Sequence, residues 1–163
     1  MRRFAPSAFV SAAAVFMVGC ATSSDRRTND GASSASMAHA AHEAYVNAIN
    51  SNNLDAVLAM LTDDVVFMAP HEPRLVGKAA VRPWAEGYLG AFRIHWEKTT
   101  LEFVVSGEWA FEQYAYKCTD TPRSGGPAVH DSGKGINIYH RDPDGTWRVA
   151  RDAWSSDLPA TTK

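Results

Sequence analysis

Asp152 and Trp154 stand two positions apart near the C-terminus of this 163-residue chain. The stretch 147–155 around them is rich in aromatic and β-branched residues, which predicts a strand whose side chains alternate between two faces. Asp152 and Trp154 therefore share a face, and a carboxylate that loses water beside an aromatic ring is suited to proton transfer. The alternative role is structural, in which Asp152 forms an ion pair with Arg148 or Arg151 at the edge of a sheet.

A second residue suited to proton transfer is His71, which follows Pro70 at the end of the apolar run 65–69. An imidazole titrates near neutral pH and can act as a general base, although a lone loop histidine is more often simply exposed. His39 and His42 open the first predicted helix, where a solvated face is the expected position. The alternative for His39 and His42, at i and i+3, is a metal bound together with Glu43 on one helical turn. The other histidines show no metal-ligand spacing and no glycine-rich phosphate loop appears, so we predict neither a metal nor a cofactor.

Cys20 is a candidate for covalent modification. It follows Met1-Arg2-Arg3 and the apolar run 4–18, which is too short to span a bilayer but typical of a signal peptide. The end of this run, Met17-Val18-Gly19-Cys20, resembles the lipobox of bacterial lipoproteins. We predict a signal peptide over 1–19 and a lipid on Cys20, with the protein exported to the periplasmic side of the cell envelope and anchored to the outer membrane. The alternative is a plain secretory signal, with Cys20 incidental.

The rest of the chain divides by composition. Residues 20–36 are polar and predict a lipid-anchored flexible tether, residues 37–158 have the size of one domain, and 159–163 are expected to form a disordered tail. Loss of Arg2 and Arg3 with the signal peptide leaves a weakly acidic protein without a basic cluster, which argues against a nucleic-acid partner. The lipid anchor is then the one expected contact with a membrane.

Within 37–158 the pattern changes from helices to strands. Apolar residues at helical spacing predict one helix over 37–51 and a second from Leu54, with Asn53 as its cap. A third helix is expected after Gly77; Pro83 disturbs its early part, so its regular part is predicted to begin near Arg82. Strands are expected over 65–69, 99–106, 109–118, 129–140 and 147–155. Helices followed by antiparallel strands indicate an α+β domain, with the helices on one face of a curved sheet.

Two segments resemble the nuclear transport factor 2-like superfamily, in particular its ketosteroid isomerases and SnoaL-like polyketide cyclases. They are EAYVNAINSNNLDAVLAMLTDDVVFMAP, residues 43–70, and GTWRVARDAWS, residues 145–155. The resemblance implies a cone-shaped curved mixed β-sheet packed against three N-terminal helices and enclosing a pocket. The superfamily includes enzymes, binding proteins and scaffolds, so the fold alone does not assign a function.

The resemblance also implies roles for single residues. Tyr45 stands where the isomerases have a tyrosine that donates to the oxyanion, and Asn137 stands where they have a protonated aspartate. The structural alternative is a core Tyr45 paired with Asn137. The isomerases' general base is replaced by Ala69, so a steroid isomerase mechanism is not supported, and Asp152 becomes the candidate acid/base because SnoaL-like cyclases use an aspartate. The expected lining of the pocket is Trp154, His71, Tyr139 and Trp84.

Two functions stay open at this point. One is an isomerase, cyclase or dehydratase that moves protons with Asp152, Tyr45 and Asn137. The other is a non-catalytic periplasmic domain that binds a ligand or a partner protein. In either case the expected ligand is a small apolar or polycyclic molecule. Apolar residues on both faces of the predicted strands further predict a homodimer.

Overall fold

The computed structural model describes residues 23–159. The predicted signal peptide, Cys20 and residues 160–163 of the predicted tail lie outside this range. The elements follow in the order α1 (Ser23–Asn50), α2 (Leu54–Ala59), β1 (Leu61–Met68), β2 (Leu75–Val76), α3 (Lys78–Ala91), β3 (Phe92–Ser106), β4 (Trp109–Pro122), β5 (Val129–Arg141) and β6 (Trp147–Ser156).

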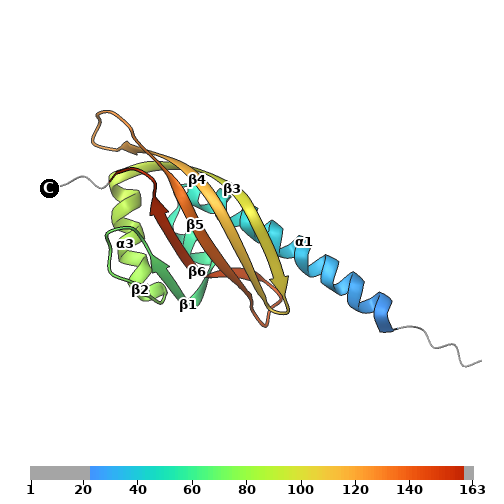
Figure 1. Cartoon of the computed structure of the whole chain (residues 1–163). Coiled ribbons are helices and arrows are strands. Elements are labelled where there is room, and N and C mark those ends of the chain that lie inside the picture. Colours follow the sequence, from blue (N-terminus) through green and yellow to red (C-terminus); the bar gives the residue numbers. More distant parts are fainter. Residues whose placement is uncertain (1–22, 160–163) are drawn as a thin grey trace, which may run out of the picture.

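One curved, open sheet of six strands forms the body of the domain, in the order β2-β1-β6-β5-β4-β3. The sheet is mixed because β1 pairs with β6 in parallel, whereas the other neighbouring strands are antiparallel. Helix α1 runs along the sheet and extends from one end of the domain, and α3 stands beside the sheet at the opposite end of the domain (Figure 1). The predicted α+β architecture, with a curved mixed sheet against three N-terminal helices, is confirmed.

Local sequence explains where the helices start. The side chain of Asn53 accepts a hydrogen bond from the backbone N–H of Ala56, which is the predicted cap of α2. Gly77 precedes α3 with a φ of 81°, a backbone conformation that glycine adopts without strain. Between these helices, the parallel pairing of β1 with β6 brings Phe67 opposite Asp152. The segment between α2 and α3 therefore places the aromatic residue Phe67 beside the strand that carries the candidate carboxylate.

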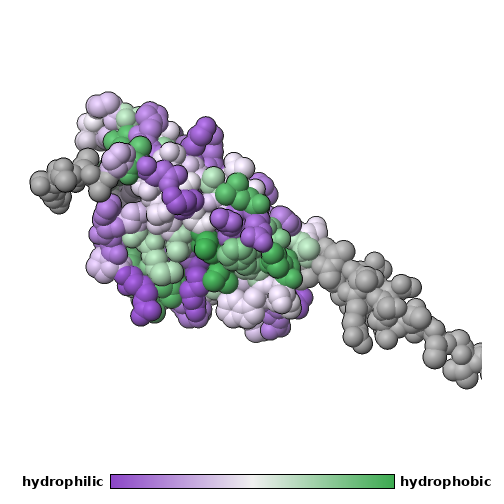
Figure 2. Space-filling model, viewed as in Figure 1, coloured by the Kyte–Doolittle hydropathy of each residue, from purple (hydrophilic) through white to green (hydrophobic). Residues whose placement is uncertain are grey.

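The strands β4 and β5 alternate clearly between a buried and an exposed face. The exposed face nevertheless carries apolar residues, because Val104, Phe111 and Ile138 lie side by side in register and Ile136 and Trp109 share their face. Figure 2 shows hydrophobic surface gathered on the sheet, next to the end from which α1 extends. We call Val104, Trp109, Phe111, Ile136 and Ile138 the outer apolar patch.

Some predicted boundaries were wrong. Helix α1 starts at Ser23 and not at residue 37, so residues 23–36 of the predicted tether are helical. Their polar composition predicts that they join no hydrophobic core, but it does not exclude a helix. Extending a helix that is already formed costs little free energy, so a polar segment can continue it. Helix α3 is regular from Lys78, with Pro83 inside it. No helix among residues 23–159 is both long enough and apolar enough to cross a membrane.

Candidate active site

A cavity of about 560 Å³ lies between the helices and the concave face of the sheet. Its wall is mainly apolar and includes seven aromatic residues, and Trp154 is at the centre of this aromatic part of the wall. The ring of Trp154 lies 5.9 Å from Phe67, 6.1 Å from Trp84 and 6.2 Å from Trp96, centroid to centroid, with edge-on geometry in each case. Tyr88 extends the wall, 5.7 Å from Trp84. These rings form a space that suits a flat apolar molecule.

One part of the cavity lining is polar and contains Asp152, which is 4% exposed. Tyr45 Oη donates a hydrogen bond to Asp152 Oδ2 at 2.8 Å, and Tyr114 Oη donates to Oδ1 at 3.0 Å. Burial and the neighbouring Asp152 charge raise the pKa of both phenols well above the usual value of a tyrosine. Both tyrosines therefore remain protonated hydrogen-bond donors. Together with Asp152 they form the polar end of the cavity.

The register of the sheet brings this group together. Asp152 on β6 pairs with Asn137 on β5, which pairs with Glu112 on β4, so the three residues form one row on the inner face. In the next row Gly135 stands between Trp154 and Tyr114. Because Gly135 has no side chain, the ring of Tyr114 lies close to it and its hydroxyl reaches Asp152.

Lys98 is the fourth member of the polar end, and it was not predicted from the sequence. It lies on β3, its side chain is 1% exposed, and its Nζ is 3.9 Å from Asp152 Oδ2. Its ammonium also lies 4.0 Å from the centre of the Tyr114 ring and 5.0 Å from that of Tyr45. Burial lowers the pKa of Lys98 below its ordinary value, against the opposing effect of the Asp152 and Glu112 charges.

Asn137 contributes to the polar end in a different way from the one that the resemblance implied. It is fully buried and is not part of the cavity lining. Its Oδ1 accepts a hydrogen bond from Lys98 Nζ at 3.1 Å, while Tyr45 is bonded to Asp152. Asn137 therefore orients Lys98 instead of joining Tyr45 in a pair of ligand-facing donors.

The four residues expected to line the pocket fall into two groups. Trp84 and Trp154 line it, but His71 and Tyr139 do not. His71 is exposed with a φ of 62° in the turn after Pro70, where β1 has already ended. Tyr139 is fully buried and donates to Glu112 Oε2 at 2.8 Å. The predicted pocket position of both residues was therefore wrong.

Glu112 is the centre of a second buried hydrogen-bond network, which was not predicted from the sequence either. Its two carboxylate oxygens lie 2.9 and 3.0 Å from His42 Nδ1, and Thr100 donates to it at 2.7 Å. His42 is 5% exposed, so the expected solvated position of this histidine was wrong. The reason is that α1 packs across β3, and in this packing His42 of the helix faces the core.

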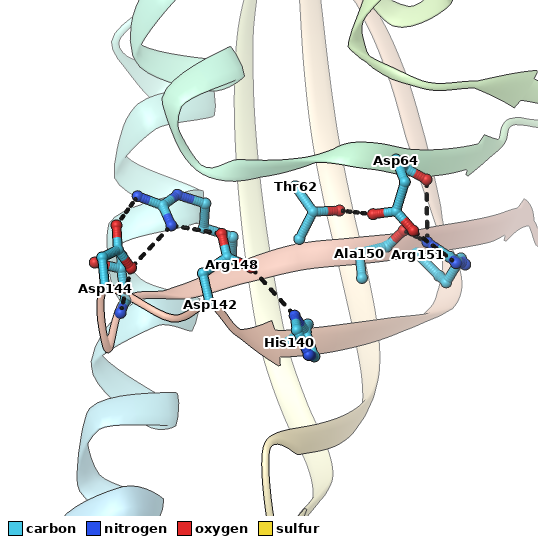
Figure 3. A network of polar contacts seen from close by, with 9 residues as sticks. Thr62, Asp64, His140, Asp142, Asp144, Arg148, Ala150 and Arg151 are labelled. Atoms are coloured by element: carbon cyan, nitrogen blue, oxygen red, sulfur yellow. Dashed lines mark hydrogen bonds and ion pairs between the residues drawn. The ribbon is translucent and has the colours of Figure 1, made fainter.

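The arginines beside Asp152 in the sequence belong to a separate surface network (Figure 3). Arg148 pairs with Asp142 at 2.6 Å and with Asp144 at 2.9 Å, and Arg151 pairs with Asp64 at 3.3 Å. Neither guanidinium contacts Asp152. The structural alternative for Asp152, an ion pair with one of these arginines, was therefore wrong.

Comparisons with known proteins agree with this geometry. The sequence model of the SnoaL-like domain matches residues 42–150, which is more than half of the chain. This protein belongs to the SnoaL-like domain family. A search of curated proteins gives no match.

Among solved structures, this SnoaL-like domain is similar to a ketosteroid isomerase-like protein from Erwinia carotovora atroseptica, with 28% identity over 77% of this chain and 97% of the other and a TM-score of 0.70. It shares its fold with two more distant proteins. A proposed dehydratase of the NTF2-like family from Streptomyces avermitilis is 18% identical over 79% of this chain and 99% of the other, with a TM-score of 0.69. A proposed scytalone dehydratase from Novosphingobium aromaticivorans is 16% identical over 80% and 89%, with a TM-score of 0.71.

The SnoaL-like pocket has an alanine where the resemblance to the isomerases implies their base. Ala69 lies in the cavity wall beside Pro70, and a methyl group takes no part in proton transfer. Among the described residues no cluster of three or more histidine, cysteine or acidic side chains is arranged to hold a metal ion. The titratable groups of the polar end are Asp152, Lys98 and the two tyrosines.

Proposed function

We propose that this protein is an acid/base enzyme of the isomerase, cyclase or dehydratase type that acts on a flat, apolar ring compound with a carbonyl or hydroxyl oxygen. The observation that carries this proposal is the meeting of Asp152, Tyr45, Tyr114 and Lys98 at one end of an aromatic cavity. Proton transfer by these side chains needs no cofactor. Proteins of the same fold that are named as isomerase-like or dehydratase support the reaction type and leave the substrate open.

The size of the cavity and the distribution of its polar groups support this class of ligand. A cavity of about 560 Å³ falls within the range of small-molecule sites, roughly 300–1,000 Å³. Rings of the ligand pack on Trp154 and Trp84, and its oxygen turns to the polar end, where Lys98 and the phenols offer positive charge and donors. Charge that develops on the oxygen in the transition state is stabilised there, in a site with little water.

Asp152 is the acid/base group in this proposal. Each of its oxygens accepts one tyrosine hydrogen bond, and a carboxylate has about four lone-pair sites, so capacity remains for a substrate proton. Tyr45 and Tyr114 keep the carboxylate oriented towards the cavity. The same two bonds favour a second candidate function: a carboxylate already held by two donors also suits a protein that only binds its ligand.

Proton exchange tests the proposal without knowledge of the natural substrate. β-Tetralone, a flat bicyclic ketone, is incubated in D₂O with the full-length chain, and deuterium uptake next to the carbonyl is followed by NMR. Asp152→Asn is expected to slow the enzymatic exchange on the order of a hundredfold or more. Asp63→Asn is the matched control, because the Asp63 side chain is 98% exposed.

Binding is measured in parallel with the fluorescent phenol β-naphthol. We expect Asp152→Asn to retain naphthol binding while losing exchange, since the aromatic wall is unchanged. Wild-type protein that binds β-naphthol but does not accelerate exchange above the buffer rate would contradict the enzymatic proposal and favour the binding protein.

A further inference from the structure

Lys98 has surroundings unlike those of the other lysines for which the structure gives an ion pair. Its side chain is 1% exposed, whereas those of Lys78 and Lys134 are 33% and 62% exposed. Lys98 is nevertheless part of the cavity lining, so a ligand in the pocket lies next to this side chain. Within residues 23–159 the Lys98 nitrogen makes one hydrogen bond, to Asn137, although an ammonium has three donors.

The groups around Lys98 keep its nitrogen reactive. The side chain lies among the rings of Tyr45, Trp96 and Tyr114, and the Asp152 carboxylate is at 3.9 Å, beyond a direct hydrogen bond. The side chain is almost inaccessible to solvent, and burial lowers the pKa of Lys98 despite the nearby carboxylates. A lysine desolvated in an apolar pocket is a nucleophile towards carbonyl carbon.

We propose that Lys98 forms a Schiff base with an aldehyde or ketone bound in the cavity. This inference rests on the proposed function, because it needs the carbonyl oxygen of the ligand at the polar end. It narrows the substrate class to carbonyl compounds and makes Lys98 a catalytic residue.

The chemistry balances with the groups that are present. A small shift of the Lys98 side chain closes the 3.9 Å gap to the Asp152 carboxylate to hydrogen-bond distance, and the ammonium passes a proton to it. The nitrogen lone pair then forms the N–C bond while the carbonyl π electrons move to oxygen. That oxygen takes the proton from Asp152, takes a second one that comes from the same nitrogen, and leaves as water. Overall, ammonium and carbonyl give iminium and water, with the positive charge kept on nitrogen. The iminium acidifies the neighbouring C–H, whose proton Asp152 then removes.

Reductive trapping tests the nucleophile directly. The full-length chain is incubated with β-naphthaldehyde and sodium cyanoborohydride, which reduces an iminium to a stable amine, and the product is mapped by mass spectrometry. We expect one naphthylmethyl group on Lys98, formed several-fold faster than on the exposed Lys117, and loss of the fast label when β-naphthol occupies the pocket. Labelling of Lys98 no faster than Lys117, in protein that binds β-naphthol, would overturn the proposal.

Two variants separate this inference from the proposed function. Lys98→Arg keeps the positive charge but cannot form the Schiff base, so it is expected to lose β-tetralone exchange as completely as Lys98→Met does. If Lys98→Arg keeps the exchange while Asp152→Asn loses it, Lys98 acts through its charge, and the Schiff base is refuted while the proposed function stands. If Lys98 is trapped but Asp152→Asn exchanges normally, the Schiff base stands and the role of Asp152 fails.

Discussion

Gly135→Ala tests whether Tyr114 occupies the position that the polar end requires. A methyl group at residue 135 would lie 2.6 Å from the carbonyl oxygen of Ala153 and closer still to Cζ and the hydroxyl of Tyr114. Carbon atoms do not approach so closely, and the Ala153 oxygen is backbone, so the neighbouring strand or the Tyr114 ring must move. Movement of the ring breaks its hydrogen bond to Asp152.

The overpacking at residue 135 and the broken hydrogen bond between Tyr114 and Asp152 both lower the free energy of unfolding. Overpacking a core costs about 1–3 kcal/mol, and a hydrogen bond to a charged group contributes about 1.5–3 kcal/mol. We expect the free energy of unfolding to fall by about 3–5 kcal/mol, out of the roughly 5–15 kcal/mol typical of a domain. The melting temperature should then fall by about 10 °C or more.

Urea denaturation followed by tryptophan fluorescence measures this loss. The control is Gly90→Ala in α3, where an added methyl group has nothing within 4 Å and should stabilise the helix by about 0.5–1 kcal/mol. In a Tyr114→Ala background, Gly135→Ala should cost clearly less than in the wild type, because the two residues share the same space. Equal cost in both backgrounds would refute the assigned position of the Tyr114 ring.

Three further predictions concern the buried network, assembly and anchoring. Burial raises the pKa of Glu112, but hydrogen bonds from His42, Thr100 and Tyr139 outweigh it and leave a lowered pKa; the stabilisation is therefore present above the pKa of the unfolded state, about 4.3, and is lost as the pH falls through the folded value. The stability difference between wild type and Glu112→Gln, from melting curves, should shrink over that acidic range, and a constant difference would contradict the lowered pKa. We propose that the outer apolar patch pairs two copies of the chain, so Ile136→Asp should convert a dimer to a monomer in light scattering, whereas a monomeric wild type would refute the pairing. We also propose that Cys20 carries the lipid anchor of an exported protein, so Cys20→Ala should abolish lipid labelling, and unchanged membrane attachment would exclude this anchor.

The fold was predictable because its signals are local and mutually consistent. The apolar periodicity of α2 and α3 and the alternation along β4 and β5 each select one element type, and their order in the chain selects the architecture. The shared face of Asp152 and Trp154 was predictable as well, since the two residues stand two positions apart on one strand. The packing of α1 against the sheet brings Tyr45 to Asp152, which no local pattern specifies.

Lys98 was missed because the predicted strand started at Thr99, whereas β3 starts at Phe92. Charged residues in Arg93-Ile-His-Trp-Glu-Lys98 obscured the period of two, although Ile94, Trp96 and Lys98 fall on one face. That alternation was the available signal. Long-range contacts decide the rest: His42 is buried because its helix crosses a strand that carries Thr100, next to Glu112.

The polar end of the cavity is tested most directly by a crystal structure of the protein with β-naphthol bound. We predict that the naphthol rings lie against Trp154 and Trp84, with the phenol oxygen within hydrogen-bond distance of Asp152 or Lys98 Nζ. A naphthol oxygen that points to the mouth of the cavity near Glu72, or a ligand bound outside the cavity, would contradict the assignment of these residues to a site for acid/base chemistry.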